Sequence, residues 1–323
     1  MNKRIYNVDL ENITQETLTE LKTQYMQNPM SLLEVDKEDA DFLTKRITGM
    51  MKDYLEGCGL GGYVVGLSGG IDSSLVLDLS VEAVGAENVL GLMISSGKTS
   101  QESVDFAKRL ADHYDVAHAS VDKRLFEMAI TVDNLIEEDI ERQLVEQGRW
   151  KHQPSDYIAM RIGNDHARQR MKILRRQTAK YGCLVNGTTN DTEQLLAYFT
   201  IGGDGRGGVD IESIVKLPKT SEYQFARHRN LPQEVVDRIP SAELMDGHTD
   251  EGELSRSLGH KVSYQTIDLM LTGRKLGLDA EEIVKANNSP LITKECIGAL
   301  YKFCDRMSFK TKPEPYADLI QFT

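Results

Sequence analysis

The sequence lacks an apolar run long enough to cross a lipid bilayer. No apolar stretch reaches the roughly 18 residues of a membrane-spanning helix, and the first residues, MNKRIYNVDLENITQETL, contain no apolar core followed by a small-residue cleavage site. We therefore expect a cytoplasmic protein. The 323 residues, 40% hydrophobic and 27% charged, predict an ordinary globular chain that can bury a core.

Cysteine is also scarce. The four cysteines, Cys58, Cys183, Cys296 and Cys304, are widely separated and form no C-x-x-C pair. Paired spacings are typical of disulfide frameworks and zinc sites. We expect four reduced thiols and neither kind of site.

Basic residues are outnumbered by acidic ones. The chain has 38 Lys and Arg against 50 Asp and Glu, a formal net charge of -12. This balance excludes a general nucleic-acid surface, because binding to a phosphate backbone requires a basic face. A polyanionic ligand would have to be met locally, by clustered Lys and Arg or by a divalent cation held on carboxylates.

Strand-like and helix-like patterns alternate along the chain. The expected order is helix 40–57, a strand ending near Gly66, a helix after Asp72, strand 89–94, helix 101–114, strand 116–121, helix 123–150, helix 165–181, strand 183–186 and helix 192–199. This order predicts an α/β fold, a doubly wound and mainly parallel sheet with helices on both faces. Residues 1–35 are expected to form an N-terminal arm or a short helix packed from outside, and residues 36–323 a single domain whose C-terminal part, from about residue 221, is helical.

One glycine-rich turn, SGGIDSS (residues 68–74), separates the first strand from its helix. A turn at this place presents backbone N–H groups to an anion at the positive end of a helix. It is neither the Walker pattern nor G-x-G-x-x-G. It resembles the pyrophosphate loop of the N-type ATP pyrophosphatases, a Rossmann-like class. The plainer alternative is a strand-to-helix turn with Asp72 and Ser73 as helix caps.

A second stretch, residues 164–200, carries both a basic stripe and a polar strand end. On a helix, Arg168, Lys172 and Arg175 form a stripe that could meet phosphate or could simply be a solvated face. Strand 183–186 then runs into NGTTN, followed by Glu193. Two carboxylates on two strand-end turns, Asp72 and Glu193, are a sensible way to hold a magnesium ion that also takes phosphate oxygens.

Seven motifs in order make the resemblance more specific. SGGIDSS, HARQRM, LVNGTTNDTEQLLAYFT, GDGRGGVDI, LPKT, PSAEL and TDEGEL, spread over about residues 40–312, resemble ammonia-dependent NAD synthetases. That family adenylates the nicotinate carboxylate of deamido-NAD with ATP, uses Mg²⁺ and then displaces AMP with ammonia. The resemblance also implies a homodimer with small-molecule substrates.

The resemblance implies roles for particular residues. The ATP contacts would be Gly66, Leu67, Ser68, Gly69, Gly70, Ile71, Asp72, Ser73, Thr188, Lys219 and Ser241. The deamido-NAD contacts would be Arg168, Asp210 and Lys310, and the metal ligands Asp72 and Glu193. No covalent nucleophile is implied. Lys219 as a surface lysine at a helix start and Asp210 as a turn residue are the structural alternatives.

The sequence departs from this family at the acceptor side. Ile201 stands where the family commonly has a substrate-contacting lysine, and Arg206 lies in a two-residue insertion from which it could reach the same site.

Residues 240–255 are a candidate lid or a plain surface loop. Two other functions stay open: a related ATP pyrophosphatase that adenylates and amidates a different carboxylate, and a non-catalytic nucleotide-binding protein. Free ammonia is the expected donor, with a separate glutaminase partner as the alternative.

Overall fold

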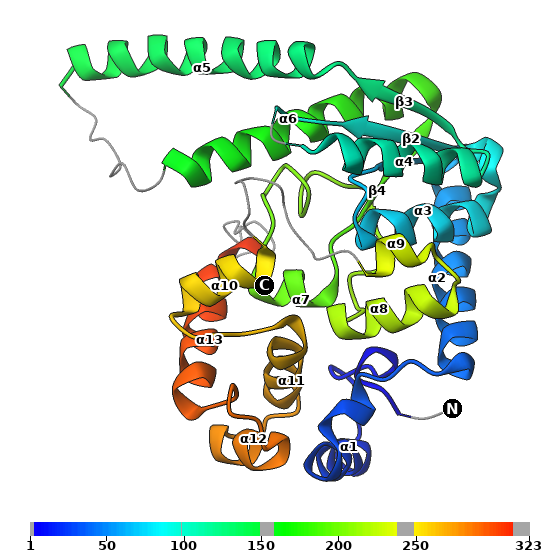
Figure 1. Cartoon of the computed structure of the whole chain (residues 1–323), viewed down its shortest axis with the longest axis vertical. Coiled ribbons are helices and arrows are strands. Elements are labelled where there is room, and N and C mark those ends of the chain that lie inside the picture. Colours follow the sequence, from blue (N-terminus) through cyan, green and yellow to red (C-terminus); the bar gives the residue numbers. More distant parts are fainter. Residues whose placement is uncertain (1–2, 98, 149–157, 238–248, 313–323) are drawn as a thin grey trace, which may run out of the picture.

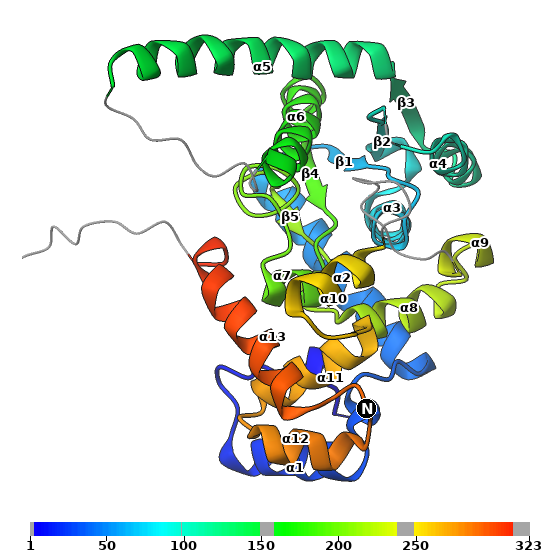
Figure 2. The same cartoon turned by 60° about the vertical axis from the view of Figure 1, so that its left-hand side comes forward.

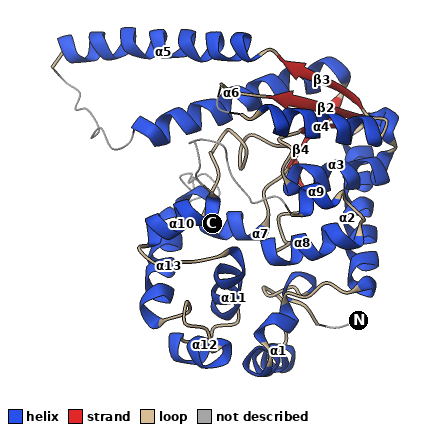
Figure 3. Ribbon diagram, viewed as in Figure 1, coloured by secondary structure: helices blue, strands red, loops and turns tan. Residues whose placement is uncertain are grey.

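The computed structural model of the chain describes residues 3–97, 99–148, 158–237 and 249–312. Its centre is a sheet of five parallel strands in the order β3-β2-β1-β4-β5; the strands are labelled in Figure 2 and coloured red in Figure 3. The strands are β1 (Gly62–Gly66), β2 (Val89–Ile94), β3 (Ala117–Val121), β4 (Cys183–Gly187) and the short β5 (Ile211–Glu212). The predicted doubly wound parallel sheet is confirmed.

Helices cover both faces of this sheet because its strands are apolar on both sides. Tyr63 and Val65 of β1 belong to the core on one face, whereas Val64 belongs to the core on the other. The first face carries α2 (Lys37–Cys58), α3 (Ile71–Val84), α4 (Gln101–His113), α8 (Lys219–His228) and α9 (Gln233–Val236). The second carries α5 (Lys123–Glu146) and α6 (Ile158–Tyr181) (Figure 1).

A third core lies beyond the carboxyl ends of the strands and is made of helices and the segments that connect them (Figure 2). It joins α7 (Asp191–Leu196), α10 (Asp250–Leu258), α11 (Tyr264–Lys275), α12 (Ala280–Asn287) and α13 (Lys294–Met307) to the N-terminal α1 (Gln15–Gln27). Tyr25 of α1 is fully buried there, and its hydroxyl donates to the carbonyl of Leu269 at 2.7 Å. The N-terminal segment therefore packs into the core of the C-terminal helices.

The helix expected from residue 165 begins seven residues earlier, at Ile158. Two other predicted boundaries are wrong for a local reason that the structure shows. The helix expected over 192–199 ends at Leu196, because Ala197 adopts a left-handed conformation with φ 51°. The loop expected up to Ser255 is helical from Asp250, where the Thr249 hydroxyl accepts the N–H of Gly252 as an N-cap. The rest of that loop, 238–248, lies outside the described residues, as does the predicted end of helix 123–150.

In the part of the chain that is described, every helix is too short or too polar to cross a membrane. Cys183, Cys296 and Cys304 are buried free thiols and Cys58 is an exposed one.

Removing the Tyr25 hydroxyl should destabilise the third core. In Tyr25→Phe the carbonyl of Leu269 and the amide of Asn287, which donates to the same hydroxyl at 2.9 Å, both lose a buried partner. We expect the free energy of unfolding in urea to fall by about 1–2 kcal/mol. The control is Tyr54→Phe on α2, whose side chain is 45% exposed. Equal stability of the two variants would contradict this account.

Candidate active site

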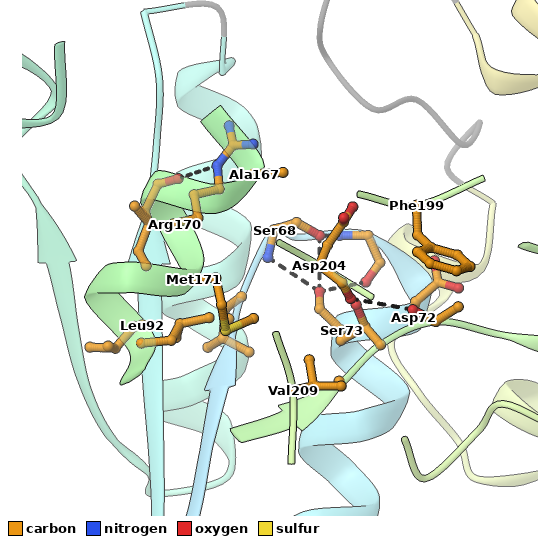
Figure 4. A pocket seen from close by; sticks show the side chains of 18 of the residues that line it. Ser68, Asp72, Ser73, Leu92, Ala167, Arg170, Met171, Phe199, Asp204 and Val209 are labelled. Carbon is orange, nitrogen blue, oxygen red and sulfur yellow. Dashed lines mark hydrogen bonds between the residues drawn. The ribbon is translucent and has the colours of Figure 1, made fainter. Parts of the chain in front are cut away.

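A cavity of about 340 Å³ opens at the carboxyl ends of β1, β2 and β4 (Figure 4). β1 is flanked by β2 on one side and β4 on the other, so the chain changes direction here and the crossover helices diverge. Open parallel sheets bind ligands at such a switch point. The sequence therefore places its glycine turn where a ligand can be surrounded from several strands.

The turn after β1 is held in shape by its own hydroxyls. The Ser73 hydroxyl accepts the N–H of Ser68 at 3.2 Å and donates to the carbonyl of Gly70 at 3.1 Å. Gly69 has φ 82°, a left-handed conformation that favours glycine. α3 then begins without a side-chain cap, which leaves its positive end directed at the cavity.

Asp72, in the first turn of α3, meets two residues from distant elements. Both of its carboxylate oxygens accept from the ammonium of Lys219 at 2.5 Å, and Oδ1 also accepts from the side-chain amide of Asn190 at 2.8 Å. Burial opposes the charge, but Lys219 and Asn190 outweigh it and lower the pKa of Asp72. Asp72 is therefore a carboxylate at neutral pH.

Two further acids surround the same lysine, which is 1% exposed. Oε2 of Glu222 lies 3.2 Å from the Lys219 ammonium, an ion-pair distance, and Glu222 is fully buried. Burial, followed by repulsion from Asp72, raises the pKa of both Glu222 and Glu193 well above the ordinary value. Burial disfavours the Lys219 charge, yet attraction to these acids holds the pKa of Lys219 well above normal. The cluster thus carries more acid than one lysine can neutralise.

Most of the predicted nucleotide-binding residues line the cavity together. They are Gly66, Leu67, Ser68, Gly70, Ile71, Asp72, Ser73, Thr188 and Glu193. Of the other described candidates, Gly69 and Lys219 lie outside this lining, Lys219 directly behind Asp72. Ser241 lies outside the described residues.

The predicted acceptor residues lie around the cavity rather than in its wall. Arg168 is half-exposed and donates to the carbonyl of Ile201 at 3.4 Å. Asp210 pairs with Arg175 and accepts the N–H of Val185 at 2.8 Å, which ties its loop to β4. Lys310 donates to the carbonyl of Ala197 at 2.6 Å.

Lys310 nevertheless lies close to the wall. Its ammonium sits 4.9 Å from the ring centre of Phe199, which lines the cavity (Figure 4). It also donates to the carbonyl of that same residue.

Sequence reasoning missed several lining residues, of which Arg170 is the clearest. It lies on the same face of α6 as Ala167, Met171 and Leu174, and its guanidinium donates to the carbonyl of Ile94 at 3.1 Å (Figure 4). The spacing i, i+3, i+4, i+7 from Ala167 was the available signal. Tyr198, Phe199, Asp204 and Tyr223 also line the cavity, and no periodicity marked them.

The carboxylates of Asp72 and Glu193 fit a magnesium site in part. Both line one cavity, and the mutual repulsion that raises the pKa of Glu193 is the kind that a divalent cation relieves. Within the described residues, no three His, Cys, Asp or Glu side chains form a metal-binding group. An ion here would need its remaining ligands from phosphate oxygens and water, as Mg²⁺ commonly does.

The sequence model of the NAD synthase family matches residues 43–313. The NH(3)-dependent NAD(+) synthetase of Methanococcoides burtonii is 37% identical over 240 residues, which are 71% of this chain and 82% of the relative. That of Methanocaldococcus jannaschii is 35% identical over 265 residues, 82% and 93% of the two chains.

A solved structure shares the fold. The NMN synthetase of Francisella tularensis superimposes with a TM-score of 0.65 at 23% identity, over 87% of this chain and 99% of that one. The fold and the curated relatives define an enzyme, a ligase of the ATP-using type. The chain belongs to the NAD synthase family, so the predicted resemblance is confirmed.

Removing the Lys219 ammonium should destabilise the whole protein at neutral pH. Lys219→Met leaves the charge of the partly buried Asp72, whose side chain is 23% exposed, without a cation, and breaking a pair whose lysine is fully buried costs about 3 kcal/mol. In the wild type the pKa of Asp72 is lower in the folded protein than in the unfolded chain, so the charged carboxylate stabilises the fold above the unfolded pKa. Without Lys219 the sign reverses, and the charged carboxylate destabilises the fold at neutral pH. The deficit in unfolding free energy should therefore shrink as the pH falls from 7 toward 4.

The matched control is Lys216→Met, an exposed lysine three residues earlier. Chemical denaturation at both pH values measures the difference. A Lys219→Met deficit that matches the control, or that grows at acid pH, would contradict the assigned charge on Asp72.

Proposed function

We propose that this protein makes NAD from deamido-NAD, ATP and ammonia through an adenylated nicotinate carboxylate, releasing AMP and pyrophosphate. The observation that carries the proposal is that the glycine turn after β1 and two carboxylates from different crossovers, Asp72 and Glu193, line one cavity. Membership of the NAD synthase family supports the same activity. We further propose the cytoplasm as its location, where these substrates are made and used.

The leaving groups explain why ATP is needed. Ammonia cannot displace oxide from a carboxylate, whereas AMP departs readily from an acyl-adenylate. The first step forms the bond between the carboxylate oxygen and the α-phosphorus and breaks the bond to pyrophosphate. In the second step ammonia attacks the acyl carbon and AMP leaves. The protein needs no nucleophile for either step, so its contribution is positioning and charge stabilisation.

We assign the phosphate end of the cavity to the turn. The N–H groups and hydroxyls of Ser68, Gly70 and Ser73 are suited to an anion at the start of α3. Asp72 and Glu193 would hold Mg²⁺, which when bound would neutralise charge on the departing pyrophosphate. Thr188 and Lys219 would contact ATP from the neighbouring elements, and Ser241 is kept as a further candidate.

The acceptor is assigned to the side bounded by α6 and the 200–210 loop. Arg168, Asp210 and Lys310 are its proposed contacts, and Arg170 is added because it lines the cavity. Arg206 is the proposed substitute for the lysine that Ile201 replaces. Free ammonia is the proposed nitrogen donor, as in the relatives named NH(3)-dependent, and a separate glutaminase remains the alternative.

We also propose a homodimer formed through α5. This helix buries Phe126 and Ile130 against the sheet. On its outer face it leaves a row of apolar side chains that are at least half exposed: Leu125, Met128, Val132, Leu135, Ile136 and Ile140. α5 runs along the outer edge of the molecule in both views (Figures 1 and 2). An apolar stripe of this length with spacings of three and four residues is typical of a helix that packs on another chain.

Incubation with ATP, Mg²⁺, ammonium and deamido-NAD tests the proposed reaction. We expect AMP, pyrophosphate and NAD in equal amounts, and Asp72→Asn should lower kcat at least about 100-fold by removing a charge from the phosphate end. The second acceptor to test is nicotinate mononucleotide, because the structural neighbour from Francisella tularensis is an NMN synthetase. AMP without NAD would support a different carboxylate acceptor, and no pyrophosphate with either acceptor would reject the proposal.

A charge placed in the α5 stripe should separate the proposed dimer. Leu135 is 59% exposed, so Leu135→Glu should leave the fold intact and put a carboxylate in the contact. Light scattering after gel filtration is expected to give half the wild-type mass. Glu138→Lys, an exposed charge change beside the stripe, is the control and should stay dimeric. A wild type that is monomeric at assay concentration would remove this part of the proposal.

A further inference from the structure

α11 lies at the centre of the C-terminal helical layer and packs against both α7 and α8. Most of its residues are buried, as expected for an interior helix. Asp268 is the acid among its buried residues: it is 2% exposed, and in the described part of the chain its carboxylate accepts hydrogen bonds from two threonines rather than from a basic side chain. It also lies outside the described lining of the cavity.

The two oxygens of Asp268 bind two different elements. Oδ1 accepts from the hydroxyl of Thr192 on α7 at 2.5 Å, and Oδ2 accepts from the N–H of Thr220 on α8 at 2.7 Å. The Thr192 hydroxyl in turn accepts the N–H of Lys219 at 2.9 Å. One carboxylate therefore joins the first turns of α7 and α8 through a directed chain of hydrogen bonds.

These two first turns carry the residues that reach Asp72. Asn190, the N-cap of α7, donates to Asp72, and so does the ammonium of Lys219, the first residue of α8. Glu193 follows Thr192 directly and is bound to Asn190 by a reciprocal capping box. A shift between α7 and α8 would thus move Glu193 and Lys219 relative to Asp72.

We propose that Asp268 is a positioning residue for the nucleotide and metal end of the site, holding Glu193 and Lys219 in register with Asp72 without touching substrate. This inference rests on the proposed function, since it assigns the phosphate end of the cavity to ATP. A residue of the C-terminal helical layer thus supports the phosphate turn indirectly, through the two helices that contact Asp72.

The site requires a carboxylate at this position. Both partners of Asp268 are donors, because the Thr192 hydroxyl already accepts from Lys219 and must donate onward. An asparagine has one acceptor oxygen, so it cannot accept both hydrogen bonds as the carboxylate does: at least one of the two charge-assisted bonds is lost or reversed in direction. Burial raises the pKa of Asp268 to about 6, and the hydrogen bonds from Thr192 and Thr220 oppose that rise, so the carboxylate is charged at pH 8.

A purely structural role is the competing explanation, and Asp78 offers the matched control. Asp78 is also a buried acid, 5% exposed, on α3. It accepts from Arg229 at 2.6 Å and from the Tyr114 hydroxyl at 2.9 Å, away from the cavity lining. Asp78→Asn should lower the melting temperature and leave nucleotide binding unchanged.

Calorimetric titration with ATP in excess Mg²⁺ at pH 8 tests the inference, together with the melting temperature of each full-length variant. Asp268→Asn should weaken ATP binding about 10-fold, the usual cost of losing a residue that orients metal or phosphate ligands. Steady-state kinetics should show the same rise in KM for ATP and in the Mg²⁺ needed for half-maximal rate. The KM for the acceptor should stay within about twofold.

Thr192→Val breaks the same chain of hydrogen bonds while keeping the side-chain shape, and it carries the test if Asp268→Asn fails to fold. If the two residues act through one another, the double variant should bind ATP no more weakly than the worse single variant. Near wild-type ATP binding in both single variants, or an equal loss in Asp78→Asn, would overturn the inference alone. A wild type that binds no ATP would overturn the proposed function and the inference with it.

Discussion

The burial of one ammonium group, that of Lys219, is the constraint on which the site depends. Three acids that come from the turn after β1, from α7 and from α8 surround it. An ammonium group buried by itself would cost several kcal/mol, so Lys219 is tolerated in the interior only when these acids are in place. The phosphate turn and the C-terminal helices must consequently dock before the site exists. Folding and site assembly are in this sense one event.

This constraint also explains why the site lies between the core of the parallel sheet and the core of the C-terminal helices. The parallel sheet supplies the turn and the positive end of α3, whereas the helical layer supplies α11, whose Asp268 binds the first turns of α7 and α8. A reaction that uses positioning and charge, with no protein nucleophile, needs this kind of rigid support. The N-terminal helix adds to it, because Tyr25 closes the far side of the same helical core on Leu269.

Sequence reasoning was strongest where a local rule decides the outcome. The alternation of strand and helix predicted the sheet, and the glycine turn predicted an anion site whose residues do line one cavity. It was weaker where it had to decide which of several side chains on one helix faces the cavity. Arg168 was taken from a motif, whereas Arg170 is the arginine in the cavity wall, because it shares the face of Ala167 and Met171. The end of α7 before Ala197 and the start of α10 after Thr249 were predicted wrongly, because a single backbone conformation or a single capping side chain sets each helix end.

The sequence by itself determined the class of fold, the place of the phosphate turn and the family, since each follows from periodicity, from short motifs and from their order along the chain. Only the tertiary structure decided which charges neutralise one another. Short motifs marked Asp72 and Lys219, but nothing in the sequence showed that these two residues pair with each other. No local pattern distinguishes Glu222 and Asp268 from solvated residues on a helix surface. Burial changes their energetics, and burial is a property of the packed molecule.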